Sequence, residues 1–288
     1  MTKAHLPPRC AGNDNAVTRS NWMVAGDTVT LGRAEGGGIW FRGQCVRCNS
    51  QAAPFDLAVG ELASHLRPLW LAASSTSAST MMPLPAVTFQ PGAVARSIVL
   101  GMSAVSPGIL QRWPDVRRLL DPAAPAALPS GMKLYVAMTR GRTAWVSGHL
   151  CGFYNAGPRA PQRTKEGQPR LLNAVASVFF PPLAWQLVED GAEMLDEQRW
   201  ADISQFLSIP PGNTHNLHEF ARELPLVRHP SHEVNGDDEW MILVEDTPTI
   251  IECLDVTAKD SDDALTRRRT MDRVIVSLDE IEALRRAH

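Results

Sequence analysis

The sequence predicts an α+β fold divided into a small N-terminal module and a larger mixed body. Some segments carry apolar residues at helical spacing, whereas others alternate and are rich in β-branched and aromatic residues. The 22 prolines among 288 residues favour short elements. Small and polar residues ending in prolines fill 72–85, so we expect one domain at 1–71 and a second at 86–288.

Composition excludes several protein classes. Hydrophobic residues make up 44% and charged residues 20%, as in ordinary globular domains. No apolar run approaches the ~20 residues that span a bilayer, so no membrane partner is expected. The first ten residues lack the apolar centre of a signal peptide, and five cysteines do not suggest a disulfide framework. A cytoplasmic, reducing setting is therefore expected, where C-x-x-C indicates a metal or redox element.

The N-terminal module is expected to contain strands followed by a helix. Residues 15–31 form short extended segments, and a glycine loop at 36–39 leads into a strand that ends at Cys45. After Asn49, apolar residues recur at mostly helical spacing, which predicts a helix starting near Pro54.

The larger body is expected to mix both types of element. Helices are predicted at 91–105 and at 108–121, the second interrupted by Pro114. Strands are predicted at 132–140, 143–155 and 171–180, the first two as a hairpin, with another strand pair within 239–256. A capping box, Ser277 and Glu280, predicts a C-terminal helix.

Four N-terminal side chains form a candidate zinc site. Cys45 and Cys48 make a two-ligand knuckle, but tetrahedral structural zinc takes four ligands. Cys10 and His5 complete a set of three thiolates and one imidazole, which would stabilise a unit with a small core. The alternative is that Cys45 and Cys48 are buried free thiols at a turn.

The stretch "CVRCNS", preceded by a glycine loop and strand and followed by a helix, resembles the HNH (His-Me finger, ββα-metal) endonuclease modules. Many of these carry a Cys pair, then Thr-Arg-(Glu/Ser)-His, then C-x-x-C-Asn. This chain shows Cys10, then "TRSN" at 18–21, then Cys45, Cys48 and Asn49. The similarity covers residues 5–60, about a fifth of the chain.

The resemblance implies two catalytic positions, Asn21 and Asn49. Asn49 matches the asparagine that orders the metal loop of such modules, whereas Asn21 stands where they place a catalytic histidine. That histidine is the general base that activates water, while an ion such as Mg²⁺ stabilises the leaving group. An asparagine has no titratable base, so the resemblance implies nucleic-acid binding with the usual cleavage chemistry lost.

A second function remains open, in which the zinc site is purely structural and the body binds a protein partner. Residues 1–50 carry six Lys/Arg against three Asp/Glu, whereas 237–263 carry ten acids against Lys259. The basic module favours nucleic acid, and the acidic region favours a protein partner. Two H-x-x-H pairs form a further candidate metal site or a set of surface loop histidines: His215, His218, His229 and His232.

Overall fold

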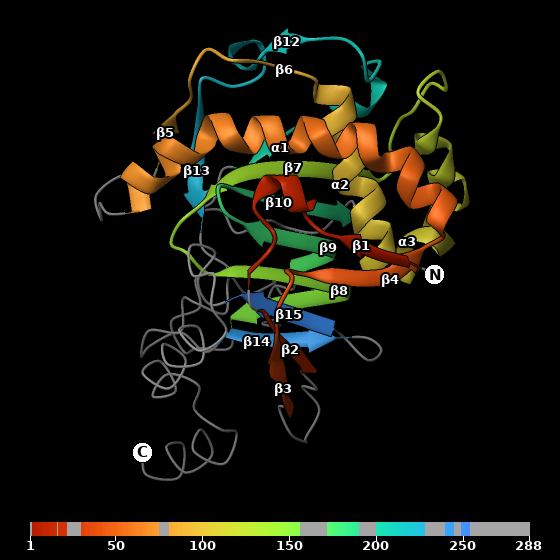
Figure 1. Cartoon of the computed structure of the whole chain (residues 1–288), viewed down its shortest axis with the longest axis vertical. Coiled ribbons are helices and arrows are strands. Elements are labelled where there is room, and N and C mark those ends of the chain that lie inside the picture. The colour runs from red at the N-terminus through yellow and green to blue at the C-terminus, as the bar shows by residue number, and fades with distance from the viewer. Residues whose placement is uncertain are drawn as a thin grey trace, which may run out of the picture.

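A computed structural model describes residues 2–15, 17–21, 30–74, 81–155, 172–189, 200–227, 240–244 and 249–253. It contains helices and a large sheet, which confirms the predicted α+β class (Figure 1). The predicted C-terminal helix, together with His229 and His232, lies outside the described residues.

Within the described residues, the main sheet has eleven strands and is almost entirely antiparallel. Its order is β3-β2-β15-β8-β9-β10-β7-β13-β5, with β14 also on β8 and β11 also on β7. The bounds are β2 Val17–Asn21, β3 Thr30–Glu35, β5 Met81–Pro83, β7 Met132–Thr139, β8 Ala144–Asn155, β9 Leu172–Phe180, β10 Leu183–Glu189, β11 Ala201–Asp202, β13 Glu223–Val227, β14 Trp240–Val244 and β15 Thr249–Cys253.

Two smaller strand pairs lie outside this sheet. β1 (Thr2–His5) pairs with β4 (Trp40–Gln44), and β6 (Thr88–Phe89) pairs with β12 (His215–Asn216). The first pair runs directly into the longest helix, which makes it the part of the fold that positions the candidate site.

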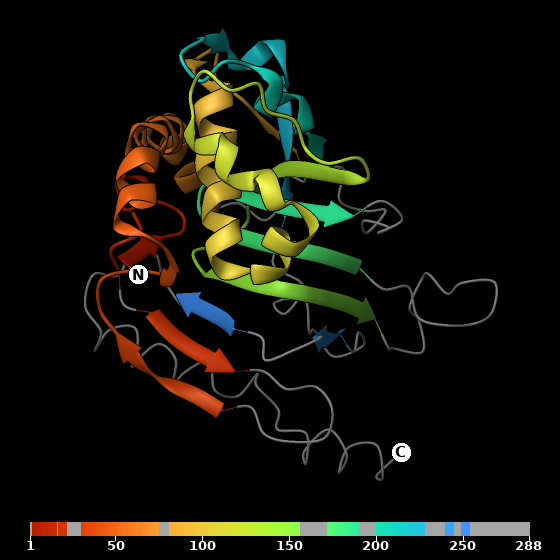
Figure 2. The ribbon, with the colours of Figure 1, turned by 90° about the vertical axis from the view of Figure 1, so that its right-hand side faces the viewer.

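The helices pack beside the sheet. They are α1 (Val46–Ser74), α2 (Pro91–Val105) and α3 (Pro107–Arg112), with short 3-10 turns η1 (Arg9–Ala11), η2 (Pro114–Leu120), η3 (Ser204–Ser208) and η4 (Leu217–Glu219). α2 contacts α1 as well as β8 and β9, and Figure 2 shows it in front of the strands. No helix within the described ranges is long and apolar enough to cross a bilayer.

Nearly every residue of α2 is buried, as expected for a helix that is apolar on all sides. Arg96 differs from the other buried residues of α2 because its side chain is charged. It donates to the carbonyl oxygens of Leu119, Asp121 and Ala124 at 2.7 to 2.9 Å. Arg96 therefore ties the end of η2 to the core and satisfies carbonyls that the short turn leaves unpaired.

Several expectations are confirmed. α2 has the predicted bounds 91–105, and the segment that follows is helical on both sides of a break before Pro114. Strands occupy the predicted stretches near 132, 144 and 172.

One hydrophobic core of the described residues spans both sides of 72–85, from Leu6 to Leu224. The regions predicted as two domains, 1–71 and 86–288, therefore pack against one another through this core.

Three expectations are wrong in detail. α1 begins at Val46 and not near Pro54, because the Cys45 carbonyl already accepts the first helical bond, from the Asn49 N–H at 3.0 Å. β7 and β8 do not form a hairpin: β10, which turns back from β9, pairs along the whole of β7. β14 and β15 each pair with β8 and not with one another.

A carboxylate lies between α1 and α2. Asp56 accepts a hydrogen bond from the Ser97 hydroxyl at 2.6 Å. Burial raises the pKa of Asp56 to about 6, and the bond from Ser97 only partly offsets this effect. The charged form of Asp56 therefore weakens the α1–α2 interface at neutral pH.

We expect Asp56→Asn to stabilise the protein above pH 6. Because the folded-state pKa is raised, stability is greatest below the unfolded pKa and is lost as the pH rises through about 6. The gain in unfolding free energy should be about 1–3 kcal/mol at pH 8 and should vanish near pH 4. Urea unfolding across this pH range measures it, with the exposed Glu61→Gln as the control on the same helix. An equal difference at every pH would contradict this assignment.

Candidate nucleic-acid interface

β1 and β4 form a short antiparallel ribbon with distinct faces. Ala4 lies opposite Phe41, and both are buried. His5 lies opposite Trp40, so these two side chains share the other face. Lys3 and Arg42, both exposed, lie on that face too, because their charged groups approach the Trp40 ring. The outer face of the ribbon thus consists of Lys3, His5, Trp40 and Arg42.

Cations surround the aromatic ring on this face. The Lys3 ammonium lies 4.2 Å from the centre of the Trp40 ring, and the Arg42 guanidinium lies 5.9 Å from it. Arg9 lies close enough to His5 for its positive charge to lower the pKa of the imidazole. We call Lys3, His5, Arg9, Trp40 and Arg42 the ribbon patch. Its combination of cations with an aromatic ring is typical of surfaces that bind nucleic acid.

His5 is held by a backbone contact. Its Nε2 lies 3.0 Å from the Gly37 carbonyl oxygen, which can only accept a hydrogen bond. In the neutral ring, Nε2 therefore carries the proton and Nδ1 is the basic nitrogen. Burial lowers the pKa of His5, with Arg9 and Lys3 adding to the effect, although the Gly37 bond opposes it. The imidazole is consequently mainly neutral at pH 7, with its proton on Nε2.

Asn13 fixes the two loops that support the ribbon. The side chain is almost fully buried and donates to the carbonyls of Pro7 at 2.6 Å and Ile39 at 2.8 Å. Its Oδ1 accepts from the Ile39 N–H at 2.6 Å. Gly38 has φ +82°, and a Cβ there would collide with Asn13, so the close approach requires glycine.

The ribbon also meets α2 directly. A Cβ on Gly43 would overlap the backbone of Ala104 in the last turn of that helix. The Gln44 amide donates to the Leu100 carbonyl at 3.0 Å. β4 therefore approaches α2 at backbone distance and enters α1 in a fixed direction.

Cys45 and Cys48 lie together at the start of α1. Their Sγ atoms are 2.7 Å apart, and the Cys48 N–H donates to the Cys45 sulfur at 3.0 Å. Bonds from Cys48 lower the pKa of Cys45, whereas the bond to Cys45, followed by burial, raises the pKa of Cys48. Cys45 is exposed and Cys48 is half-buried.

The structure does not bring Cys10 or His5 to this pair. The Cys10 thiol donates to the Asp56 carbonyl at 3.0 Å and lies against Gly60. Asp56 is eight residues beyond Cys48 on α1, which corresponds to about 12 Å along the helix. His5 is bonded to Gly37. Within the described ranges no three His, Cys, Asp or Glu side chains form a group that could hold a metal.

The predicted zinc set therefore does not fit this arrangement. Two thiolates on tetrahedral zinc, each about 2.3 Å from the ion, are about 3.8 Å apart, and two further donors are needed. The Sγ atoms of Cys45 and Cys48 are much closer than this.

The predicted catalytic asparagines lie in different secondary-structure elements. Asn21 belongs to β2 of the main sheet, where it pairs with Thr30 and Thr249. Asn49 lies in the first turn of α1, and its N–H donates to Cys45. The sequence patterns Lys3-x-His5 and Trp40-x-Arg42 indicate a common face once the pairing of β1 with β4 is known, but the sequence alone did not reveal that pairing.

The described histidines of the second candidate site make separate contacts. His215 Nδ1 lies 2.9 Å from the Glu219 carboxylate, beside the capping box of η4. His218 Nε2 donates to the Leu84 carbonyl at 2.8 Å. These contacts tie η4 to the segment before β6.

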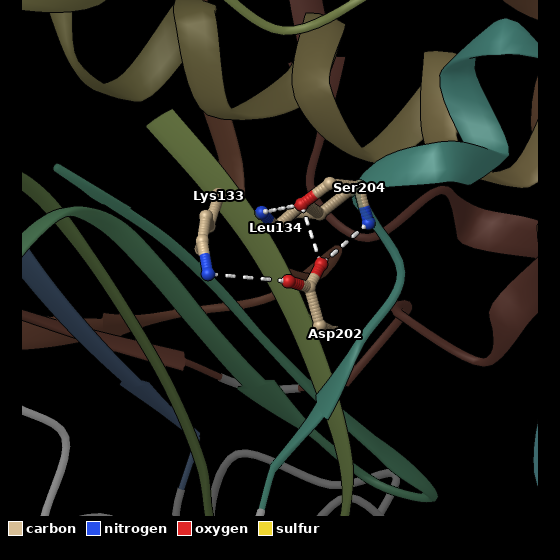
Figure 3. A network of polar contacts seen from close by, with 4 residues as sticks. All are labelled: Lys133, Leu134, Asp202 and Ser204. Carbon is tan, nitrogen blue, oxygen red and sulfur yellow. Dashed lines mark hydrogen bonds and ion pairs between the residues drawn. The ribbon is translucent and has the colours of Figure 1, made fainter. Parts of the chain in front are cut away.

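A further polar cluster links β7 to η3 (Figure 3). Ser204 Oγ lies 2.6 Å from Asp202 Oδ1 and accepts from the Leu134 N–H at 3.0 Å, so the hydroxyl proton points to Asp202. The Lys133 ammonium is 3.6 Å from the other oxygen of Asp202. Ser204 is fully engaged in joining the two elements, which indicates a structural role.

No family model matches the chain, and the comparisons with curated proteins and with solved structures found no match. The geometry of the N-terminal region singles out the ribbon patch and the cysteine pair, which follow one another along β4 and α1.

We expect Asn13→Ala to destabilise the protein by about 2–4 kcal/mol. The substitution leaves the buried Ile39 N–H and the carbonyls of Pro7 and Ile39 without the Asn13 side chain. Urea unfolding measures the loss. The neighbouring Asp14→Ala changes an exposed side chain and should stay within about 0.5 kcal/mol of wild type. Equal effects of the two substitutions would show that Asn13 does not hold the loops.

Proposed function

We propose that the N-terminal part of the chain binds nucleic acid through the ribbon patch, as a ββα unit of HNH-like type. Support comes from the order of elements: β1 and β4 pair antiparallel, and β4 leads directly into α1. "Cys-x-x-Cys-Asn" lies at that junction, as the resemblance implies. In this arrangement His5, on β1 and facing Trp40 across the ribbon, would take the role that the resemblance assigned to the position of Asn21.

The observation that carries the proposal is the shared face of Lys3, His5, Trp40 and Arg42. Lys3 and Arg42 are exposed, so they meet phosphate oxygens without a large desolvation cost. The Trp40 ring holds both cations by cation–π contacts. An imidazole whose Nδ1 is basic lies among them. This arrangement suits a phosphodiester backbone better than a neutral small molecule.

The chemistry of His5 follows from its tautomer. With Nε2 donating to Gly37, Nδ1 is oriented as the nitrogen that accepts a proton from water or a ribose hydroxyl. The flanking cations favour the phosphate group that would lie beside it. The proposal concerns binding at this patch, with His5 in contact with the bound backbone.

We expect the full chain to bind a fluorescent DNA or RNA oligonucleotide with an affinity that falls steeply with salt. Lys3→Ala combined with Arg42→Ala should weaken binding at least about tenfold at 0.1 M salt. The slope of log K against log salt should become less steep by about 2 for a duplex, because two phosphate contacts are lost. Fluorescence anisotropy over a salt series measures both quantities.

A matched control removes the same charges elsewhere. Lys133→Ala combined with Arg222→Ala deletes one lysine and one arginine near β7 and β13, away from the ribbon, and should leave affinity and slope close to wild type. An equal loss in both double variants would mean that general charge, not the ribbon patch, carries the binding. If the wild type fails to bind either nucleic acid, the proposal is refuted and a protein partner becomes the better interpretation.

A further inference from the structure

We propose that Cys45 and Cys48 form a redox-active dithiol, which alternates between two thiols and an intrahelical disulfide at the start of α1. This inference is independent of nucleic-acid binding. It arises because, among the residues that the structure describes, no further donors join the pair that was predicted to hold zinc, and the two sulfur atoms are in contact.

The backbone already has the geometry that a disulfide needs. Cys45 precedes the first turn of α1 and Cys48 ends that turn, a spacing of three residues that places their Cα atoms within disulfide range. The sulfurs lie 2.7 Å apart, so bond formation needs them to approach by only about 0.7 Å. Oxidation therefore requires no change in the course of β4 or α1.

The two thiols are chemically unequal. Cys45 is exposed and its sulfur accepts the Cys48 N–H, while Arg117 and the positive end of α1 also favour its thiolate. Cys48 is half-buried and lies in the first turn of α1. A nucleophile at the surface with a second thiol in reach is the arrangement that thiol–disulfide exchange requires. Cys10 is held at Asp56, farther along α1, and does not compete for the pair.

The exchange balances with a small-molecule disulfide as the oxidant. The Cys45 thiolate attacks one sulfur of the disulfide, forms a mixed disulfide, and releases one small thiolate, which takes up a proton. Cys48 then loses its proton to solvent, and its thiolate attacks the Cys45 sulfur and releases the second small thiol. Two protein thiols and one disulfide thus become one protein disulfide and two small thiols. A dithiol reductant reverses both steps.

The test uses the full chain, reduced, freed of reductant and then incubated with oxidised glutathione. Wild type should lose two of its five thiols, leaving three, without a retained glutathione adduct. Peptide mapping should place the disulfide between Cys45 and Cys48. Cys48→Ser should stop at the mixed disulfide and retain one glutathione on Cys45. Cys45→Ser should react at least about tenfold more slowly at the remaining member of the pair.

Cys10→Ser is the matched control, because it removes a cysteine that is also exposed and should leave the Cys45–Cys48 disulfide unchanged. Circular dichroism verifies that each variant is folded. A persistent pair of thiols in folded wild type, or an adduct confined to Cys10, would overturn the proposal. So would one tightly bound zinc per chain that requires Cys45 and Cys48. Nucleic-acid binding is measured separately, so a failure of either proposal is distinguishable from a failure of the other.

Discussion

The three hydrogen bonds of Asn13 are the constraint on which the N-terminal part of the molecule depends. They join the loop after β1 to the residue before β4, and so decide how the two strands meet. His5 faces Trp40, and Cys45 directly precedes α1, because this junction sets the register of the ribbon. An amide satisfies both a backbone N–H and two carbonyls at once, which no aliphatic side chain of similar size can do.

A second constraint comes from α2, which is too apolar to face water on any side. The helix is covered by α1 and by strands of the main sheet, and each neighbour acquires its position from that contact. Arg96 extends the effect to η2, because its buried guanidinium can be accommodated only where several carbonyls converge. The ribbon joins the same assembly through Gly43, whose lack of a side chain permits backbone contact with Ala104.

Local sequence patterns predicted the elements better than their partners. α2 has the bounds predicted from its sequence, and Pro114 marked the break after α3 because proline lacks an N–H. The start of α1 was missed because Pro54 suggested a first turn, whereas the helix begins at Val46, eight residues earlier. The Cys45 sulfur accepts a hydrogen bond from the Cys48 N–H at that start. The place of β10 between β9 and β7, and the pairing of β1 with β4, depend on contacts distant in sequence. The ribbon patch could therefore not be predicted without the register of β1 on β4. Cys45 and Cys48, in contrast, were identified from their spacing alone.

The continuous core has a consequence for how this chain can be divided. The inner side of α1, with Phe55, Leu62 and Leu66, belongs to the same apolar cluster as Ile98 and Met102 of α2. A fragment that ended with α1 would expose this side to water and would associate or unfold. The first seventy-four residues are thus not an independent folding unit. In another protein they would need a replacement for α2 before His5 and Cys45 could take up their positions.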